Sequence, residues 1–327
     1  MQPLRYRKAS DEAGAIVALA AEPNAAFVAG GTTLVDLMKL GVMTPATLVD
    51  VNALPLGKIE FSDGGVRIGA MVRNSDLGYH KEIVARYPLL SEALLAGASP
   101  QLRNMATVGG NLMQRTRCSY FRDLSTACNK RKPGSGCAAL DGDHRMHAIL
   151  GTSEQCIAAH PSDMCVAMAA LDAVVHARGP KGERQIAFAD FHVEPGQHPE
   201  RETTLMPDEL IVAVTLPSAH GWSQSRYVKV RDRASYAFAL AAVGARLRIE
   251  GGVIKDARIA LGGVGTRPWR AVDAEQALVG KRPDRDAFAH AAEVALRNAR
   301  PRRDNAFKVV LARRAIVRAL STVHGAA

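Results

Sequence analysis

Five cysteines fall in one short stretch of the chain, residues 118–165, and their chemistry needs an explanation. Their spacing, Cys-x9-Cys-x8-Cys-x18-Cys-x8-Cys, contains no Cys-x2-Cys pair, which disfavours a zinc ribbon or a thioredoxin-type redox site. An intracellular location would keep the thiols reduced, so a disulfide network is the less favoured use. Thiolates from a long loop can ligate an iron–sulfur cluster, since a cluster tolerates irregular spacing. A zinc site, or an ordinary loop with scattered thiols, is the alternative.

Two turns with a Gly-Gly pair are suited to hold phosphate groups. Residues 29–34 (AGGTTL) follow a predicted strand and open a helix, and residues 107–112 (TVGGNL) repeat the pair beside Thr and Asn. Paired glycines let the backbone approach a phosphate, and the free N–H groups of a helix start attract its charge. The spacing is not the Gly-x-Gly-x-x-Gly of a Rossmann fold. One such turn would indicate only a tight turn, whereas two favour a dinucleotide.

Short strands and helices alternate before residue 112 and predict a compact α+β unit that positions these turns. A helix is predicted to start at Ser10–Glu12. Strands are predicted at 25–29, 46–51 and 65–72, and helical segments at 32–41 and 74–97. The following stretch, 113–160, is polar and rich in turn formers, and so long a loop is uncommon unless something holds it together.

Regular patterning resumes after the cysteine-rich stretch and predicts a second α+β domain beyond a linker. The segment 163–177 is regular and 209–217 is strand-like, with the linker at 217–222. Antiparallel strands are then predicted at 225–232, 236–250 and 253–265, and helices near 272–279, 286–298 and 305–322.

The net charge of +10 is concentrated near the C-terminus, where residues 281–318 hold eleven basic and four acidic side chains. A nucleic-acid-binding module would interleave such a patch with aromatic residues, and only Phe288 and Phe307 occur here. The stretch is therefore interpreted as a solvated helical face or a docking surface for an acidic partner subunit, and no nucleic acid is expected.

No targeting signal or membrane span is recognisable in the sequence. Its first thirty residues lack the pattern of a secretory signal, and no stretch reaches the roughly 18 apolar residues that span a bilayer. A cytoplasmic location, or a periplasmic one by co-export with a signal-bearing partner, is expected, without membrane insertion.

Four motifs together resemble one known family. They read FVAGGTTLVDLMK (27–39), QLRNMATVGGNL (101–112), HPSDM (160–164) and YVKVRDRASYAFALAAV (227–243). They resemble the FAD-binding medium subunit of the molybdenum hydroxylases, which include xanthine dehydrogenase, carbon monoxide dehydrogenase and aldehyde oxidoreductase. The resemblance runs along essentially the whole chain.

The resemblance implies an α+β fold class with two domains. A two-lobed FAD-binding domain of the vanillyl-alcohol-oxidase (PCMH) type would occupy residues 1–220, with lobes at about 1–55 and 56–220. A smaller α+β C-terminal domain, 221–327, would follow and pack against other subunits.

The resemblance also implies FAD-binding roles for individual residues. The segment from Ala29 to Leu34 would cradle the pyrophosphate, and Thr107, Gly110 and Asn111 would hold the flavin side of the dinucleotide. Asp163 would bind near the ribityl chain or adenosine, while Ile211 and Lys229 would line the isoalloxazine and adenine edges. The implied cofactor-binding residues are Val28, Ala29, Gly30, Gly31, Thr32, Thr33, Leu34, Thr107, Gly110, Asn111, Asp163, Ile211 and Lys229.

The cysteine-rich stretch is where the chain departs from the commoner family pattern. In most relatives the Gly-Gly-Asn motif and the next Ser-Asp segment lie close together, whereas Asn111 and Asp163 are 52 residues apart here. The subgroup that it resembles is narrower: bacterial aldehyde oxidoreductases and 4-hydroxybenzoyl-CoA reductases, whose flavin subunits bind a 4Fe-4S cluster in a loop insertion, here about 113–160. The ligands that we assign on this resemblance are Cys118, Cys128, Cys137 and Cys156.

The other cysteine, two histidines and six basic residues of this stretch are not assigned as cluster ligands. Cys165 follows Asp163 in an apolar run and is expected to be a buried small thiol. His144 and His147 lie in the same loop and could be ligands, but they are expected to be surface histidines. Basic neighbours are expected to offset the thiolate charge and favour deprotonated sulfur; they are Arg115, Arg117, Arg122, Lys130, Arg131 and Lys132.

The implied function is electron transfer by an oxidoreductase subunit, without a general acid or base of its own. Substrate oxidation would occur at the molybdenum cofactor of a large partner, and electrons would pass through the 2Fe-2S clusters of a small partner to FAD and an external electron acceptor. Aldehyde oxidation is favoured over thioester reduction or purine oxidation. A stand-alone FAD oxidase and a basic nucleic-acid-binding module are the alternatives from other classes.

Overall fold

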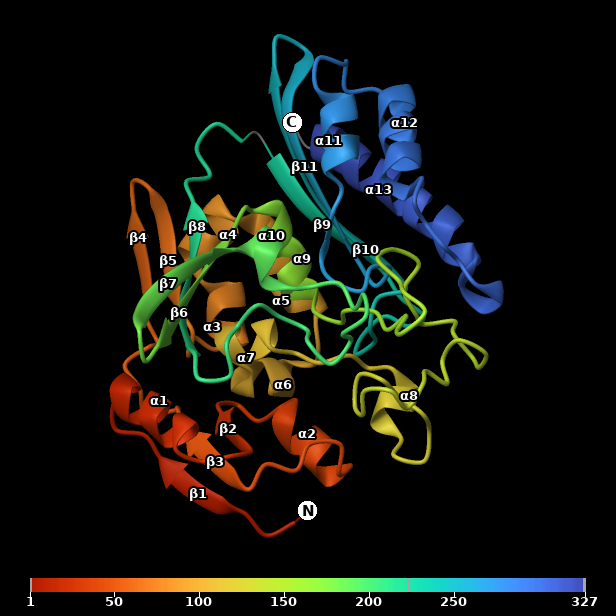
Figure 1. Ribbon diagram of the computed structural model, residues 1–327. Coiled ribbons are helices and arrows are strands. Elements are labelled where there is room, and N and C mark those ends of the chain that lie inside the picture. Colours follow the sequence, from red (N-terminus) through yellow and green to blue (C-terminus); the bar gives the residue numbers. More distant parts are fainter. Residues whose placement is uncertain (1, 223, 326–327) are drawn as a thin grey trace.

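Three β-sheets organise the computed structural model, which describes residues 2–222 and 224–325 (Figure 1). The predicted α+β fold class is confirmed by this mixture of sheets and helices. The first sheet is parallel, with the order β1-β3-β2, and two helices connect its strands. Its elements are β1 (Arg5–Lys8), α1 (Glu12–Ala20), β2 (Ala25–Val28), α2 (Leu34–Lys39) and β3 (Thr47–Asp50). Asp11 caps α1, because its carboxylate accepts the N–H of Gly14 at 2.7 Å.

The second sheet has five strands in the order β4-β5-β8-β6-β7, all paired antiparallel. Its strands are β4 (Ile59–Ser62), β5 (Gly65–Gly69), β6 (Val174–Gly179), β7 (Gly182–Ala187) and β8 (Leu210–Pro217). Apolar residues of its strands share one core with the adjoining helices. These helices are α3 (Asn74–Tyr79), α4 (Lys81–Arg86), α5 (Pro88–Ala96), α6 (Pro100–Met105), α7 (Val108–Leu112), α9 (Asp163–Ala170) and α10 (Phe188–Phe191).

The helical pattern predicted over 74–97 is divided among three helices. His80 and Tyr87 leave the helical conformation, with ψ values of 123° and 55°. Tyr87 precedes Pro88, and the proline ring disfavours helical backbone at the residue before it.

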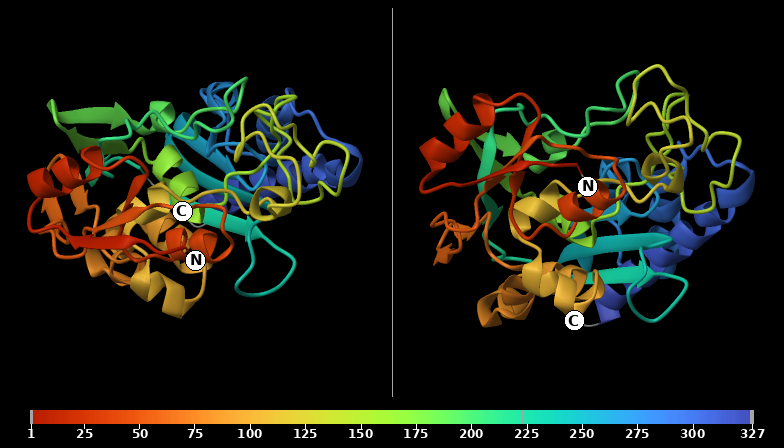
Figure 2. Two further views of the ribbon diagram at one scale, coloured as in Figure 1. Left: turned by 60° about the horizontal axis from the view of Figure 1, so that its bottom comes forward. Right: turned by 90° about the horizontal axis from the view of Figure 1, so that it is seen from below.

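The third sheet is antiparallel and is covered by the C-terminal helices (Figure 2). Its strands are β9 (Gln224–Val230), β10 (Ala241–Glu250), β11 (Val253–Gly262) and β12 (Trp269–Arg270). The helices are α11 (Val272–Leu278), α12 (Arg285–Leu296), the 3-10 helix η1 (Arg303–Asn305) and α13 (Phe307–Gly325). Alternate residues of β10 and β11 pack with these helices in a separate core.

The stretch 113–160 contains one regular element, α8 (Ser119–Arg122), and side chains hold the rest together (Figure 1). The Arg131 guanidinium donates to the carbonyls of Tyr120, Phe121 and Thr126. Asn129 bonds the side chain of Gln155 at 2.8 Å. The predicted long loop is therefore ordered by buried polar contacts rather than by an apolar period.

No helix in the described part of the chain combines the length and apolar character that a membrane span requires.

Candidate functional site

The two Gly-Gly turns, far apart in sequence, lie directly against each other. A Cβ atom on Gly30 would stand 1.8 Å from the carbonyl oxygen of Met105, just before the second turn. Gly31 has a φ of 70°, which disfavours other residues. In the second turn, the Thr107 hydroxyl accepts the N–H of Gly110 at 3.2 Å. Only glycine at position 30 permits this approach of two backbones.

A pocket of about 900 Å³ opens at these turns and extends to β8 and the segment 192–209. Such a volume lies in the range of small-molecule sites. Of the residues implied by the resemblance, those that line it are Ala29, Gly30, Gly31, Thr32, Thr33, Leu34, Thr107, Gly110 and Ile211.

The remaining implied residues lie behind or beside this pocket. Val28 ends β2, and the Asn111 side chain accepts the Ser162 hydroxyl at 2.6 Å. Asp163 lines a second, smaller pocket, in which its carboxylate accepts from the Lys229 ammonium at 2.8 Å. The two pockets are adjacent, because they share four lining residues: Thr116, Ala159, His160 and Pro161.

Four cysteine side chains surround one small cavity next to the large pocket. They are Cys118, Cys128, Cys137 and Cys156. The backbones of Cys128 and Cys137 form an antiparallel bridge, and none of the four is in a disulfide. Cys156 also lines the large pocket, so its thiol forms part of the wall between the two spaces. Cys165 lies in α9, fully buried as predicted, and outside this cavity.

Backbone amides point toward three of these sulfur atoms. The N–H groups of Tyr120 and Phe121, at the start of α8, are directed to Cys118. The N–H of Ala158 donates to the Cys156 sulfur at 3.4 Å. Cys137 receives the same contact from the amides of Ala139, Leu140 and Ile157. Amide donors stabilise negative charge on sulfur, so the cavity suits thiolates bound to a cation.

Burial dominates the acidity of these thiols. It raises the pKa of Cys118 to about 12 and that of Cys156 to about 11, and it also raises the pKa of Cys137. In the unliganded thiols, burial outweighs the basic neighbours, of which Lys130 lowers the pKa of Cys156. That these neighbours favour deprotonated sulfur at a bound cluster stays a prediction. Deprotonation of the thiols needs a bound cation.

Four of the six basic neighbours, Arg115, Arg117, Arg122 and Lys130, pair with carboxylates. Arg117 and Arg122 both pair with Asp36 of α2, at 2.8 and 2.9 Å. Lys130 pairs with Glu202 at 3.0 Å. Of the predicted neighbours, Lys130 also lowers the pKa of the Cys156 thiol, although burial outweighs it. These ion pairs tie the cysteine stretch to the rest of the site.

Comparison with known proteins agrees with this geometry. Residues 2–219 match a family model described as the FAD binding domain in molybdopterin dehydrogenase. Residues 226–323 match the CO dehydrogenase flavoprotein C-terminal domain. The chain belongs to the FAD-binding medium subunits of the molybdenum hydroxylases. This confirms the resemblance found in the sequence, and with it an FAD-binding oxidoreductase subunit.

Several relatives cover nearly all of this medium subunit. The aldehyde oxidoreductase FAD-binding subunit PaoB of Escherichia coli (strain K12) is 51% identical over 325 residues, 98% of each chain. The carbon monoxide dehydrogenase of Hydrogenophaga pseudoflava that lacks the Mo-pyranopterin moiety aligns with a TM-score of 0.78 at 27% identity, over 99% of this chain and 98% of that one. Quinoline 2-oxidoreductase of Pseudomonas putida 86 aligns with a TM-score of 0.77 at 26% identity, over 99% and 98%.

Two histidines of the medium subunit are not where the sequence predicted. His144 and His147 are 4% and 5% exposed, so the expectation of surface histidines is wrong. His144 Nε2 accepts the N–H of Asp304 at 3.0 Å. His147 Nε2 lies 3.1 Å from the Cys118 sulfur. Residues distant in sequence contact both rings, Asp304 on His144 and Cys118 on His147, and no local pattern signals these contacts.

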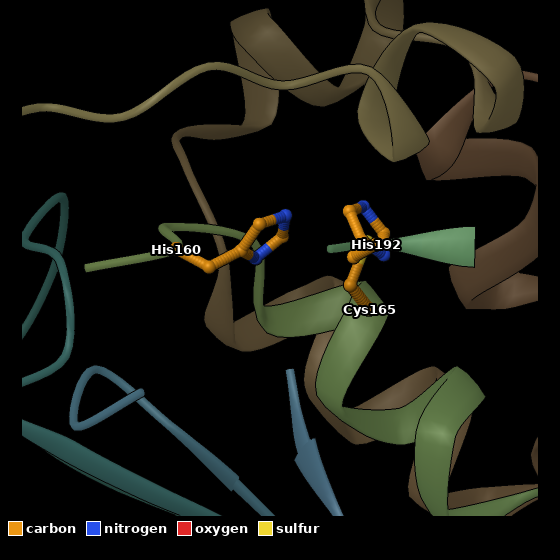
Figure 3. Close-up of side chains that lie close together, drawn as sticks. All are labelled: His160, Cys165 and His192. Carbon is orange, nitrogen blue, oxygen red and sulfur yellow. The ribbon is translucent and has the colours of Figure 1, made fainter. Parts of the chain in front are cut away.

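A second histidine–cysteine group lies beneath the large pocket and includes His160, Cys165 and His192 (Figure 3). Their potential ligand atoms all lie within 4.8 Å of one another. His192 Nε2 donates to the carbonyl of Leu112 at 3.0 Å, which leaves Nδ1 as a free acceptor. His160 Nδ1 accepts the N–H of Ser162 at 3.4 Å, so its Nε2 carries the proton. In this arrangement His160 Nε2 presents a proton and His192 Nδ1 presents a lone pair, and neither has a hydrogen-bond partner.

The His160 and His192 rings support α7, which carries the second Gly-Gly turn. Their centroids are 4.6 Å apart, and burial lowers the pKa of His192 to about 4. A neutral His192 therefore fixes the carbonyl at the end of α7.

The acid stability of the medium subunit is expected to depend on His192. Its pKa is about 4 in the folded state and 6.5 ordinarily, so the unfolded chain binds more protons between these values. Stability is thus lost as the pH falls from about 6.5 to about 4, by about 3 kcal/mol for this group. His192→Gln keeps a donor for the Leu112 carbonyl. It should flatten the profile of thermal midpoint against pH between about pH 4 and 6.5. Parallel profiles of thermal midpoint against pH for both proteins would contradict the assignment.

Proposed function

We propose that this medium subunit is the FAD- and 4Fe-4S-carrying electron-transfer subunit of a molybdenum-dependent aldehyde oxidoreductase. The observation that carries the proposal is the position of Cys156, whose side chain borders both the FAD-sized pocket and the four-cysteine cavity. The relative at 51% identity is named an aldehyde oxidoreductase FAD-binding subunit, which favours aldehydes over the substrates of a 4-hydroxybenzoyl-CoA reductase or a xanthine dehydrogenase.

The large pocket would hold FAD through backbone groups. The turns 29–34 and 107–112 would cradle the pyrophosphate and the flavin side of the dinucleotide, since Gly30 lets the two turns lie against each other where both line the pocket. Ile211 lines the same pocket. Asn111, Asp163 and Lys229 would act beside this pocket, and Val28 would act from the end of β2. The matched ranges 2–219 and 226–323 support an FAD domain over 1–220 and a C-terminal domain over 221–327.

The four-cysteine cavity would hold the 4Fe-4S cluster in the insertion at about 113–160. All four thiols line one cavity, and backbone amides are directed at three of the sulfur atoms. Such amide contacts fit thiolates that ligate a multi-iron cluster.

The residues at the boundary would let electrons pass between the two groups. FAD supplies two-electron chemistry and a 4Fe-4S cluster supplies one-electron transfer. Cys156 and Lys130 line both spaces, and the Lys130 side chain is 9% exposed. Lys130, which is paired with Glu202 at 3.0 Å, would place a cation at this boundary, and a cation favours the electron-rich forms on either side.

The subunit would work within a complex. Its electrons would come from a molybdenum-cofactor large subunit through a 2Fe-2S small subunit and leave to an external acceptor. Two relatives are named medium chains, of a glyceraldehyde dehydrogenase and a carbon monoxide dehydrogenase, which supports a partner-dependent role. The basic stretch 281–318 would be a docking surface, and a cytoplasmic or co-exported complex is consistent with this.

Metal and flavin analysis of the purified chain tests the proposal. The chain is expressed alone, so that iron from a partner subunit cannot contribute, and its FAD and metals are measured per chain. About one FAD and about four irons are expected. Zinc without iron would contradict the cluster, and absence of FAD would contradict the pocket assignment. Aldehyde oxidation by the isolated chain would favour a stand-alone oxidase.

A further inference from the structure

A buried histidine lies against one of the four cysteines that we propose as cluster ligands. His147 Nε2 is 3.1 Å from the Cys118 sulfur, whereas its Nδ1 is buried with no hydrogen-bond partner in the structure. Amide groups supply the other contacts to these sulfur atoms, so His147 adds a side-chain donor. A metal-bound thiolate carries no proton, and only the imidazole N–H can then donate in this contact.

The C-terminal domain holds His147 in this position through a fully buried lysine. Lys308 of α13 is 0% exposed, and its ammonium donates to the carbonyls of Met146, His147 and Gly263 at 3.1, 3.0 and 2.8 Å. Three acceptors match the three protons of a lysine ammonium. The sequence had placed Lys308 in a solvated basic stretch, and that interpretation is wrong for this residue.

Asn305 adds a second support from the same region. It is also 0% exposed, and its side-chain amide donates to the carbonyls of His147 and Ala148 at 3.4 and 3.2 Å. Burying an ammonium and an amide is costly, and two apolar side chains would fill the space without that cost. Both groups bond the backbone of one short segment, 146–148, which carries His147, and Lys308 links this segment to Gly263.

We propose that His147 donates a hydrogen bond to the Cys118 ligand and thereby raises the reduction potential of the cluster, with Lys308 and Asn305 as positioning residues. The inference rests on the proposed function, because it needs the cluster. An N–H donor withdraws charge from the thiolate and stabilises the more negative, reduced cluster. The C-terminal domain would then set the driving force between cluster and flavin.

Redox titration of the iron-loaded full chain, followed by its EPR signal, tests this inference. His147→Phe removes the donor and keeps the ring, whereas His147→Gln keeps an N–H donor. The Phe variant is expected to change the one-electron reduction equilibrium roughly tenfold toward the oxidised form, a fall of about 59 mV in potential. The Gln variant should recover at least half of that shift. Iron and FAD contents, measured on the same samples, report folding.

Lys308→Met distinguishes positioning from a general structural role. It should lower the potential in the same direction, and it should add no further shift to His147→Phe, because both act through one hydrogen bond. If His147→Phe fails to retain iron, the Lys308→Met variant decides, since a wild-type potential there overturns the inference.

Different failures separate the inference from the proposed function. A wild-type chain without iron overturns the cluster itself. A His147→Phe variant with full iron and an unchanged potential overturns only the role of His147. If Lys308→Met lowers the potential of the His147→Phe protein as much as it lowers that of the wild type, the role of Lys308 as a positioning residue is overturned.

Discussion

A Cys128→Ser variant is expected to be isolated with its FAD and without the iron of the proposed cluster. Cys128 is 6% exposed and lines the four-cysteine cavity, but it does not line the large pocket. A serine hydroxyl is a hard oxygen ligand and replaces a thiolate poorly on iron. Iron should fall by about four atoms per chain, with loss of the visible iron–sulfur absorption. Metal analysis and flavin released by acid give both quantities from one sample.

Cys165→Ala is the matched control for this variant. Cys165 is a fully buried cysteine in α9 that lies outside the cavity. Alanine suits the helix and fills most of the same space, so iron and FAD should stay at wild-type levels. Iron retained in Cys128→Ser, or lost in Cys165→Ala, would contradict the division of the five cysteines into four ligands and one core residue.

A Gly30→Ala variant is expected to lose FAD and to retain iron. Its Cβ would stand 1.8 Å from the Met105 carbonyl oxygen and 2.6 Å from the carbonyl carbon, and both belong to backbone that cannot rotate away. The two Gly-Gly turns must therefore separate. Overpacking of this kind costs about 3 kcal/mol. If this cost is borne by the two turns that bind FAD, the affinity for FAD falls roughly 100-fold. Flavin content after gel filtration and titration of the apoprotein with FAD measure it.

Gly57→Ala provides the control for the glycine substitution. Gly57 is exposed, and a Cβ there meets nothing within 4 Å. It should bind FAD as the wild type does. Equal FAD affinity of Gly30→Ala and Gly57→Ala would overturn the assignment of the 29–34 turn to the cofactor.

Local pattern predicted much of the fold, because most elements depend on short-range features. Turn residues bounded the strands, as at Gly30 after β2, and apolar runs marked the strands of the third sheet. The sequence did not predict the division of 74–97 into three helices. Only two single residues, His80 and Tyr87, leave the helical conformation, and the apolar spacing of the segment continues across them.

Local sequence patterns could not predict the order of the strands in the sheets. β8 comes from residues 210–217 and inserts between β5 and β6 in the second sheet. The pairing joins segments more than a hundred residues apart, so only the packing of the whole domain sets it.

The sequence by itself determined the residue types that can do chemistry here, two Gly-Gly turns and five clustered cysteines, together with the family to which they belong. Glycine spacing and thiol chemistry are local properties, so no structure was needed to recognise them. Only the tertiary structure decided which side chains meet, as Cys156 does at the wall between pocket and cavity. It also decided that His147 and Lys308 are buried together, because burial depends on packing between residues distant in sequence.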